Sequence, residues 1–358
     1  MKVVIFHDYF GMIGGGEKTV LTLATALDAD VVTTDINKEK VAKMGFEDVN
    51  IISLGETVKI PPLKQISASF KFARCDFSAK YDFYIFSGNW AHFAARRHKP
   101  NLLYCHTLVR TFYDLYDVFL QRQSFITGLL FRAWVGMHKP LCEYYMNHVD
   151  KIVVNSINTQ SRMKKYLHRD VEVIYPPVET LKYNFKEFGD FWLSVNRLYP
   201  EKRLELQIDA FRQMPEEELI IVGGYAKGDH ASKYAERIRH NLPENVALRG
   251  EITDEDLRDL YAQCKGYITT AMDEDFGMTP IEAMAAGKPV IAVKEGGYLE
   301  SMVDGVTGMM VKADVESIIK AVGIISKEPA VYKDASQERA KSFDKSVFIK
   351  RMKDVIGL

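Results

Sequence analysis

The stretch GYITTAMDEDFGMTPIEAMAAGKPVIAV, residues 266–293, contains an apolar run at each end and an amphipathic segment between them. The runs GYITTA (266–271) and KPVIAV (288–293) have the length of buried strands, and the middle segment has the pattern of a helix. Parallel strands need a crossover connection, which is usually a helix. The stretch therefore predicts one βαβ unit of a parallel sheet.

The same alternation extends through the rest of the chain, and it predicts an α/β protein. Earlier strand candidates are 3–6, 30–34, 50–54, 82–86, 101–105, 151–155 and 171–175, followed by 191–195, 218–224 and 245–250. Pro176 and Pro177 begin a turn and linker near residues 176–189, after which the pattern starts again. We predict two Rossmann-like, doubly wound domains that face a central cleft, with ligands beyond the carboxyl ends of the strands.

The predicted domain boundaries follow from this alternation. Residues 1–178 form the first Rossmann-like domain and residues 179–340 the second. Residues 341–358 form a basic amphipathic helix that either caps the second domain or crosses back to the first.

Composition narrows the function classes. The 358 residues are 47% apolar and carry 47 basic and 48 acidic side chains, which excludes a disordered chain and argues against a general nucleic-acid binder. Four widely spaced cysteines with no CxxC pair indicate free thiols in a reducing compartment. His138, Cys142 and His148 lack a recognised metal-ligand spacing, so buried or surface side chains are the favoured interpretation there.

No segment has the features of a signal peptide or a transmembrane helix. The apolar run in MKVVIFHDYF is too short for a signal peptide, and SFITGLLFRAWVGM (124–137) is interrupted by Arg132. We expect a cytoplasmic protein.

A glycine cluster, GMIGGGEKT (11–19), follows the first strand. Gly11 and Gly16 have the spacing of a Walker A loop, but Glu17 precedes Lys18, and the dinucleotide pattern GxGxxG is also absent. The cluster is either a tight turn into a helix or a place where backbone N–H groups face an anion.

The loop DEDFG, starting at Asp273, places three acids after a strand, and Glu282 follows on the next helix. Thr279, Pro280 and Glu282 have the pattern of an N-cap, an N1 proline and an N3 glutamate, which predicts a capping box. On this local pattern a cap is the favoured role of Glu282. The acids are either a solvated loop or ligand contacts.

Basic residues gather where the second domain begins. NRLYPEKR (196–203) places Arg197 after a strand and Lys202 at a helix start, where a cation is locally unfavourable unless an anion lies nearby. The pair is a candidate diphosphate clamp. Ordinary surface ion pairs with Glu201 or Glu205 are the alternative.

Taken together, these motifs resemble the retaining glycosyltransferases of family 4, which have the GT-B fold. The resemblance covers nearly the whole chain and is carried in order by GGGEK, YCHT (104–107), VVNS (153–156), VIYPPVE (173–179), NRLYPEKR and EDFGMTPIEAMAAGKPVIA. The mannosyltransferase-like branch that builds bacterial and archaeal surface glycans is the most similar.

The resemblance implies a role for each site residue. Arg197 and Lys202 would hold the diphosphate of a nucleotide sugar, Glu282 the ribose, and Glu274 the donor sugar. Backbone N–H groups at Gly277, Met278 and Thr279 would orient the sugar and phosphates, Gly15 and Gly16 would lie near the donor phosphate and acceptor, and His106 would approach the transferred sugar. For His106, a buried core histidine is the alternative.

The implied reaction is a metal-independent hexosyl transfer with retention of configuration, and it needs no cofactor. GDP-mannose is the favoured donor and a UDP-hexose the second choice. Leu108 stands where the branch usually has proline after His-Thr, and SGNWAH (87–92) replaces a stretch that often carries a histidine. Both departures lie on the acceptor side.

A glycan or lipid-linked acceptor is the expected second substrate. Residues 59–74, KIPPLKQISASFKFAR, combine four cations with Phe70, Phe72 and aliphatic residues, and RRHK (96–99) adds charge. These segments are candidates for peripheral contact with the inner face of the cell membrane, and an ordinary amphipathic surface helix is the alternative. An epimerase of the same fold and a non-catalytic sugar-nucleotide binder are the competing functions.

Overall fold

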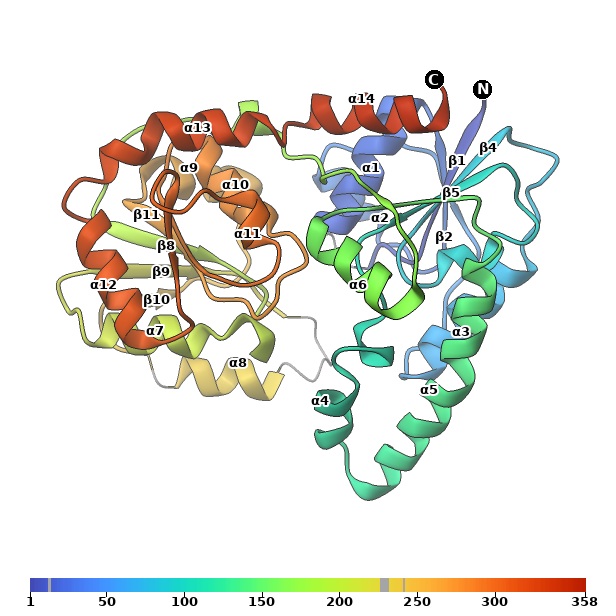
Figure 1. Ribbon diagram of the computed structural model, residues 1–358, viewed down its shortest axis with the longest axis horizontal. Helices are drawn as coiled ribbons and strands as arrows, with labels where there is room; N and C mark the ends of the chain where they lie inside the picture. The colour runs from blue at the N-terminus through green and yellow to red at the C-terminus, as the bar shows by residue number, and fades with distance from the viewer. Residues whose placement is uncertain (12–13, 226–231, 241) are drawn as a thin grey trace. The chain divides into compact units, whose positions relative to one another are not determined.

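The computed structural model describes residues 1–11, 14–225, 232–240 and 242–358 (Figure 1). Contacts divide the chain into two compact units. The first contains Met1–Tyr175 and Ile349–Leu358, and the second contains Pro176–Phe348. The last residues of the chain therefore belong to the first unit, where Arg351 donates to Glu172 at 2.8 Å.

The first unit is built on a seven-stranded parallel sheet. Its order is β3-β2-β1-β4-β5-β6-β7, with Val4 opposite Tyr84 and Leu103 opposite Ile152. The strands are β1 (Val3–His7), β2 (Asp30–Thr33), β3 (Ile51–Ser53), β4 (Phe83–Ser87), β5 (Asn101–Cys105), β6 (Lys151–Val154) and β7 (Glu172–Val173). The helices are α1 (Gly15–Leu27), α2 (Lys38–Lys43), α3 (Leu63–Arg74), α4 (Tyr116–Gln121), α5 (Phe125–Met146) and α6 (Ile157–Leu167). Short 3₁₀ turns span Ala91–Ala94 and Arg110–Phe112.

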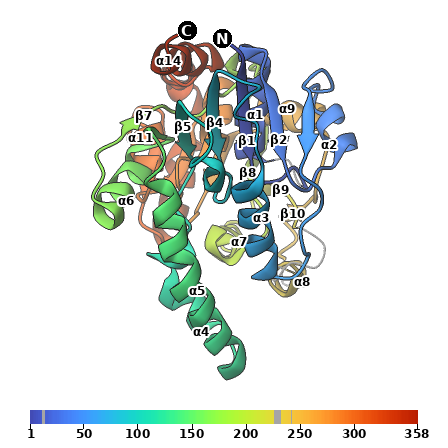
Figure 2. The ribbon, with the colours of Figure 1, turned by 90° about the vertical axis from the view of Figure 1, so that its right-hand side faces the viewer.

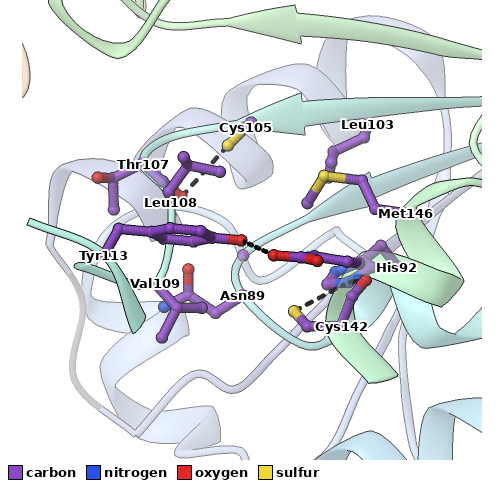
Figure 3. Close-up of a pocket in the computed structure, with 12 residues that line it drawn as sticks. Asn89, His92, Leu103, Cys105, Thr107, Leu108, Val109, Tyr113, Cys142 and Met146 are labelled. Atoms are coloured by element: carbon purple, nitrogen blue, oxygen red, sulfur yellow. Dashed lines mark hydrogen bonds between the residues drawn. The ribbon is translucent and has the colours of Figure 1, made fainter. Parts of the chain in front are cut away.

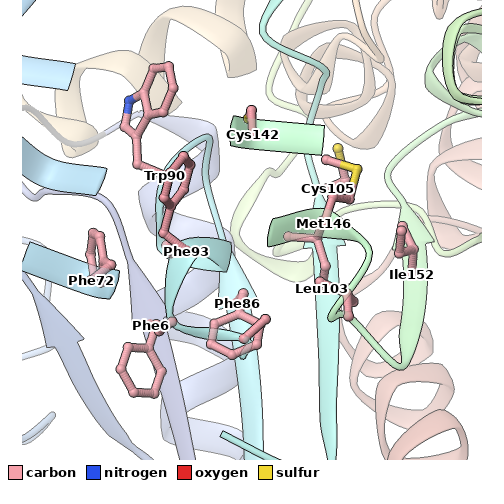
Figure 4. Close-up of a cluster of buried hydrophobic side chains, with 14 of the residues drawn as sticks. Phe6, Phe72, Phe86, Trp90, Phe93, Leu103, Cys105, Cys142, Met146 and Ile152 are labelled. Atoms are coloured by element: carbon pink, nitrogen blue, oxygen red, sulfur yellow. The ribbon is translucent and has the colours of Figure 1, made fainter. Parts of the chain in front are cut away.

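The core of the first unit forms where α3, α5 and the 91–94 turn cover one face of this sheet (Figure 4). Phe6 of β1 contacts Phe86 of β4 with ring centroids 5.5 Å apart, and Phe72 of α3 lies edge-on to Phe6 at 6.4 Å. β1 and β5 are buried along their whole length, as expected for parallel strands covered on both faces. Figures 1 and 2 show α4 and the first half of α5 projecting from this unit.

The second unit has a six-stranded parallel sheet of order β10-β9-β8-β11-β12-β13. Its strands are β8 (Phe191–Val195), β9 (Glu218–Val222), β10 (Val246–Leu248), β11 (Gly266–Thr269), β12 (Val290–Val293) and β13 (Gly308–Val311). Its helices are α7 (Leu204–Arg212), α8 (Ser232–Arg239), α9 (Asp254–Gln263), α10 (Met278–Ala285), α11 (Tyr298–Ser301), α12 (Val315–Ile325) and α13 (Lys333–Lys341), and α14 (Lys345–Ile356) begins in this unit. Short 3₁₀ turns span Thr180–Lys182, Pro200–Lys202 and Pro329–Tyr332. Trp192, Phe211 and Ile268 are fully buried in its core.

Each sheet contains one position where the strand order reverses. The reversal lies between β1 and β4 in the first unit and between β8 and β11 in the second. Loops leaving the carboxyl ends of two such strands part to opposite sides, and the space between them is the usual ligand site of open α/β sheets. Functional residues are therefore expected beyond the carboxyl ends of β1 and β4 and of β8 and β11.

The predicted α/β class and every predicted strand are confirmed, with β5 and β8 matching to the residue. The edge strand β13 was not predicted, because the run GMMV (308–311) is short and has no β-branched residue before Val311. Within the part of the chain that the structure describes, no helix has the length and apolar character to cross a bilayer.

Candidate functional site

In the second unit, Lys202 and Glu274 meet at the reversal between β8 and β11. Lys202 ends the short 3₁₀ turn Pro200–Lys202 after β8, and Glu274 lies in the loop between β11 and α10. The Lys202 ammonium donates to Glu274 Oε2 at 2.5 Å, with both side chains about one quarter exposed. A lysine has three N–H donors, so this ion pair leaves donors for an anion.

A second ion pair joins the loop after β8 to the loop after β12, where Glu295 lies. Arg203 donates to both carboxylate oxygens of Glu295, at 3.1 and 2.8 Å, and its Nε donates to the carbonyl of Thr270 at 2.8 Å. The Thr270 hydroxyl donates to the carbonyl of Lys202 at 2.8 Å. These contacts fix the backbone of Lys202 and Arg203, and the pairing with Glu274 sets the direction of the Lys202 ammonium.

The backbone beside the ion pair is strained. Arg203, directly after Lys202, has φ 48°, and Asp273, directly before Glu274, has φ 47°. The other two non-glycine residues with positive φ among those described, Asp28 and His168, end helices, where this conformation is common. Strain of this kind is retained where the surrounding contacts enforce it, which is typical of functional sites.

Three glycines allow the acidic loop to pack closely. A Cβ on Gly296 would lie 2.5 Å from the carbonyl of Glu274, and one on Gly297 would lie 2.4 Å from Phe276 Cα. Gly277 has φ 83°, and its Cβ would lie 2.6 Å from the ring of Tyr298. The turn before α11 therefore supports the loop with no space for a side chain.

The predicted capping box at Thr279 is wrong. Helix α10 begins at Met278, and its N-cap is Gly277, which has a left-handed backbone. Glu282 consequently lies too far into the helix to reach an N-cap amide. Because Gly277 can adopt positive φ, the chain enters the helix two residues before the threonine that the local pattern selected.

Tyrosine hydroxyls engage the two polar side chains of α10. Tyr261 donates to Glu282 Oε2 at 2.9 Å, and Tyr267 donates to the hydroxyl of Thr279 at 2.7 Å. Burial, reinforced by the Glu282 charge, raises the pKa of Tyr261 well above its usual value, so this hydroxyl stays a donor. Glu282 is thus oriented by a neighbouring helix, α9.

Arg197 lies in the loop after β8, and its side chain is exposed. The ion pair at Glu274 is formed by Lys202 and does not include Arg197. The backbone next to it is tightly packed, because a Cβ on Gly223 would lie 1.8 Å from the carbonyl of Asn196. The structure therefore joins Lys202 to Glu274 directly, while Arg197 stands on the same loop with its side chain toward solvent.

In the first unit, the corresponding reversal carries a neutral network. His7 ends β1, Ser87 ends β4 and His106 follows β5. The Ser87 hydroxyl lies 3.3 Å from His7 Nδ1 and 2.9 Å from His106 Nε2. Burial lowers the pKa of both histidines to about 4, so both rings are neutral near pH 7.

The glycine cluster adjoins this network. A Cβ built on Gly16 would be 3.7 Å from the ring of His106, so Gly16 and His106 are in contact. Helix α1 begins at Gly15, and Glu17 accepts the N–H of Gly14 at 2.8 Å. Met12 and Ile13 of the predicted cluster lie outside the described residues.

Asp8 is a buried acid that the sequence interpretation did not select. Its carboxylate accepts the N–H groups of Asn89, Trp90 and Ala91 at 2.6, 2.8 and 2.9 Å. Burial raises its pKa to about 7, against the opposing effect of these three donors. Gly88, with φ 95°, is required because its Cβ would lie 2.5 Å from Asp8 Cγ. The signal that could have found Asp8 and His7 is their position directly after the first apolar strand.

A pocket opens beside the neutral network (Figure 3). It is lined from the ends of β4 and β5 and from α5, with Leu103, Leu108, Val109 and Met146 forming apolar walls. Tyr113 donates to Glu143 at 3.0 Å and supplies a polar edge. Cys105 and Thr107, which flank His106 in the chain, also line the pocket.

The histidine and cysteine cluster that was considered for a metal has other partners. His138 accepts the indole N–H of Trp134 at 3.0 Å and contacts the hydroxyl of Ser69 at 3.0 Å. Cys142 contacts His92 at 3.4 Å, and burial raises the pKa of its thiol. Among the described residues, no group of three or more His, Cys, Asp or Glu side chains is arranged to hold a metal ion.

Two family models match consecutive parts of the chain. The model "Glycosyltransferase Family 4" matches residues 13–181, and "Glycosyl transferases group 1" matches residues 181–342. The chain belongs to glycosyltransferase family 4. Its resemblance to that family is therefore confirmed.

Curated relatives and solved structures agree with this assignment. The chain is 29% identical to the alpha-1,3/1,6-mannosyltransferase ALG2 of Dictyostelium discoideum over 271 residues, 64% of this chain, and 29% identical to human ALG2 over 267 residues, 66% of this chain. The chain spans 62% of the length of each of these relatives. Anabaena HepE, solved with UDP-glucose, superposes with a TM-score of 0.78 at 20% identity over the whole of both chains. The likeness to HepE establishes the GT-B fold.

Proposed function

We propose that this family 4 member is a retaining glycosyltransferase that moves a hexose from a nucleotide diphosphate sugar to a glycan or lipid-linked acceptor. The observation that carries the proposal is the Lys202–Glu274 ion pair at the strand-order reversal of the second unit. It joins a cation suited to phosphate with a carboxylate suited to sugar hydroxyls, at the edge of the sheet where ligands bind.

The proposed role of the second unit is to stabilise the leaving diphosphate. Breaking the bond from sugar C1 to phosphate leaves negative charge on the diphosphate, and fixed cations stabilise it without rearrangement. The Thr270 hydroxyl contacts the backbone carbonyls of Lys202 and Arg203, the Lys202 ammonium pairs with Glu274, and Arg197 would add a planar fork. Backbone N–H groups of Gly277, Met278 and Thr279, at the start of α10, would assist.

The donor sugar and ribose would be held by carboxylates. Glu274 would accept hydrogen bonds from sugar hydroxyls and keep its ion pair with Lys202. Glu282 would accept from the ribose, oriented by the Tyr261 hydroxyl. Mannose from GDP-mannose is the favoured donor, which the similarity to ALG2 mannosyltransferases supports, and a UDP-hexose is the second choice, since HepE was solved with UDP-glucose.

The proposed service of the first unit is to place the acceptor. His106 would face the transferred sugar as a neutral hydrogen-bonding ring, backed by Gly16, with Gly15 beside it. The pocket lined by Leu103, Val109 and Met146 would take part of the acceptor. We assign acceptor binding to residues 1–178 and donor binding to residues 179–340.

Retention is part of the proposal because the resemblance to family 4 implies it, and the two acids described in the first unit do not favour a double displacement through an enzyme carboxylate. Asp8 is engaged by three backbone N–H donors, and Glu17 is engaged by Gly14. Neither is arranged as a nucleophile. Attack on the same face as the leaving diphosphate, with the diphosphate accepting the acceptor's proton, is consistent with this arrangement.

Membrane contact through residues 59–74 and 96–99 remains a proposal. Several cations of these segments have partners within the protein. Lys59 pairs with Asp35, Lys71 donates to the carbonyl of Leu54 at 2.9 Å, and Lys99 pairs with Asp150. His98 is fully buried.

The test is hydrolysis of GDP-mannose and UDP-glucose without acceptor, followed by NMR of the product. Slow release of nucleoside diphosphate with a retained anomeric configuration is expected. An inverted product would contradict the proposal, an epimerised sugar nucleotide would indicate the epimerase of the same fold, and binding without turnover would indicate a non-catalytic binder.

A matched pair of variants locates the activity. Lys202→Gln should abolish most of the release. Lys265→Gln removes a similar ion pair, Lys265–Glu217 at 2.7 Å, which lies at the opposite, amino end of β11, and should leave release unchanged.

A further inference from the structure

Helix α5 presents large apolar side chains to solvent along one whole face. Phe125 is 91% exposed and Ile126 is 72% exposed. Leu129, Leu130, Met137 and Leu141 are each at least half exposed. We call these six residues the α5 apolar face. Contiguous exposed apolar surface of this kind marks an interaction site.

The opposite face of α5 is packed against its own unit. Trp134, His138 and Cys142 are buried there, and His138 contacts Ser69 of α3 at 3.0 Å. The helix is therefore anchored to the core along one side. Figures 1 and 2 both show its first half, after Ser124, extending beyond the rest of the first unit. The exposed fractions of the six residues show that the described part of the chain leaves the α5 apolar face largely uncovered.

The charges around this face have one sign. Residues 118–142 contain Arg122, Arg132 and Lys139 and no Asp or Glu. Arg122 and Arg132 are exposed beside the apolar residues at the projecting end. The nearest acids in sequence are Asp117 and Glu143, and Glu143 is engaged by Tyr113.

The neighbouring helix α3 repeats the same combination. Ile66 and Phe70 of this helix are 41% and 59% exposed, and they lie before and after Ser69 in the sequence. Residues 57–75 contain four cations and no acid. Two helices in contact thus both combine apolar residues with positive charge.

We propose that the α5 apolar face, with the exposed side of α3, docks on an anionic membrane surface. An amphipathic helix with cations beside its apolar face lies in the headgroup region, where apolar burial and attraction to anionic lipid act together. Self-association through this face is disfavoured, because a twofold contact would bring the arginines of the two copies together, and residues 118–142 contain no Asp or Glu.

The placement also suits the acceptor pocket. Cys142, Glu143 and Met146 of the same helix line that pocket, so docking would bring it near the membrane surface. This last step rests on the proposed function, since it needs a lipid-linked acceptor. The docking itself does not depend on the transfer reaction.

The experiment is flotation of the full chain with phosphatidylcholine vesicles, with and without phosphatidylglycerol. Ile126→Gln/Leu129→Gln/Leu130→Gln removes the centre of the face without touching the core, and should raise the lipid concentration needed for half binding by about tenfold or more. Leu181→Gln/Val331→Gln, two residues of the second unit that are 89% and 65% exposed, is the matched control and should bind as the wild type does. Arg122→Gln/Arg132→Gln should weaken binding by about fivefold per cation.

Wild-type binding that needs phosphatidylglycerol and is lost in the α5 triple variant supports the proposal. It is overturned if the wild type does not float with anionic vesicles, or if the triple variant floats equally well. A dimer in light scattering that the triple variant splits would also overturn it, by showing that a second copy covers the face. Donor hydrolysis in lipid-free solution is measured on each variant, so failure of docking is distinguished from failure of the proposed function.

Discussion

The two strand-order reversals have the same topology and opposite chemistry. In the second unit, the ion pair Lys202–Glu274 joins the loops after β8 and β11, and Arg203–Glu295 joins the loop after β8 to the loop after β12. In the first unit, the ends of β1, β4 and β5 carry a serine between two neutral histidines, and the carboxyl group of Asp8 beside them is buried against three backbone N–H donors. One sheet therefore presents fixed charge at its ligand edge, and the other presents neutral hydrogen-bonding groups.

Under the proposed function, this difference divides the transfer reaction between two similar folds. A leaving diphosphate needs positive charge that does not have to reorganise, and Lys202 of the second unit would supply it. A sugar and its acceptor hydroxyl are neutral, so buried neutral rings would bind them without the cost of removing an ion from water.

Acid should destabilise the first unit before the second. Burial lowers the pKa of His7 and His92 to about 4, below the 6.5 of the unfolded chain, so the unfolded state takes up protons first as pH falls. Stability is then present above about pH 6.5 and lost toward about pH 4, by on the order of 3 kcal/mol for each of these buried histidines.

Asp8 acts in the opposite direction. Its pKa is raised to about 7, so its contribution to stability declines as pH rises from 3.8 to 7 and offsets part of the histidine effect. His106 and His138 also have pKa values lowered to about 4, so they add to the stability that the buried histidines lose in acid. Limited proteolysis with a protease active at about pH 7.5 and about pH 5 should cut first within residues 1–175 at the lower pH. Earlier cutting within 176–348 would show that the contrast is wrong.

Loss of the Lys202 ammonium should reduce turnover with little effect on folding. Lys202→Gln is expected to lower kcat by on the order of 10²-fold or more, because the leaving charge loses a fixed cation. Thermal melting of the variant should stay near that of the wild type, since the pair is partly exposed. A kcat that matches the Lys265→Gln control would remove Lys202 from the reaction.

A side chain at Gly88 should disturb the first unit's loop. Gly88→Ala is expected to lower the free energy of unfolding by about 1–3 kcal/mol, because φ is 95° and the new Cβ would overlap Asp8. Gly136→Ala in α5 meets nothing within 4 Å and should raise stability by about 0.5–1 kcal/mol. Urea unfolding of both variants measures the difference, and equal stabilities would show that the Asp8 loop is not tightly determined.

The smallest expected effect concerns the orientation of Glu282. Tyr261→Phe removes the hydroxyl that donates to this carboxylate, at a cost of about 1 kcal/mol in stability. If Glu282 holds the ribose, KM for the donor should rise about fivefold while kcat changes little. Steady-state kinetics separates the two, and an unchanged KM would leave Glu282 with a structural role only.

Local sequence patterns predicted the elements of this fold well and its contacts less well. Strands β1–β12 were evident because buried parallel strands are continuous apolar runs, whereas the edge strand β13 is a short run, GMMV, with a single β-branched residue. The capping box at Thr279 was wrong because Gly277, two residues earlier, provides an alternative start. Asp8 and Ser87 were missed because their partners are about 80 residues away in sequence, and only the parallel pairing of β1 with β4 brings them together.

The most direct test of the central claim is a crystal structure of the chain with GDP or UDP bound. We expect the diphosphate to lie beyond β8 and β11, with an oxygen within hydrogen-bonding distance of Lys202 Nζ and the Glu274 loop beside it. A diphosphate held by the Gly14–Gly16 turn of the first unit instead, with Lys202 still directed only at Glu274, would contradict it.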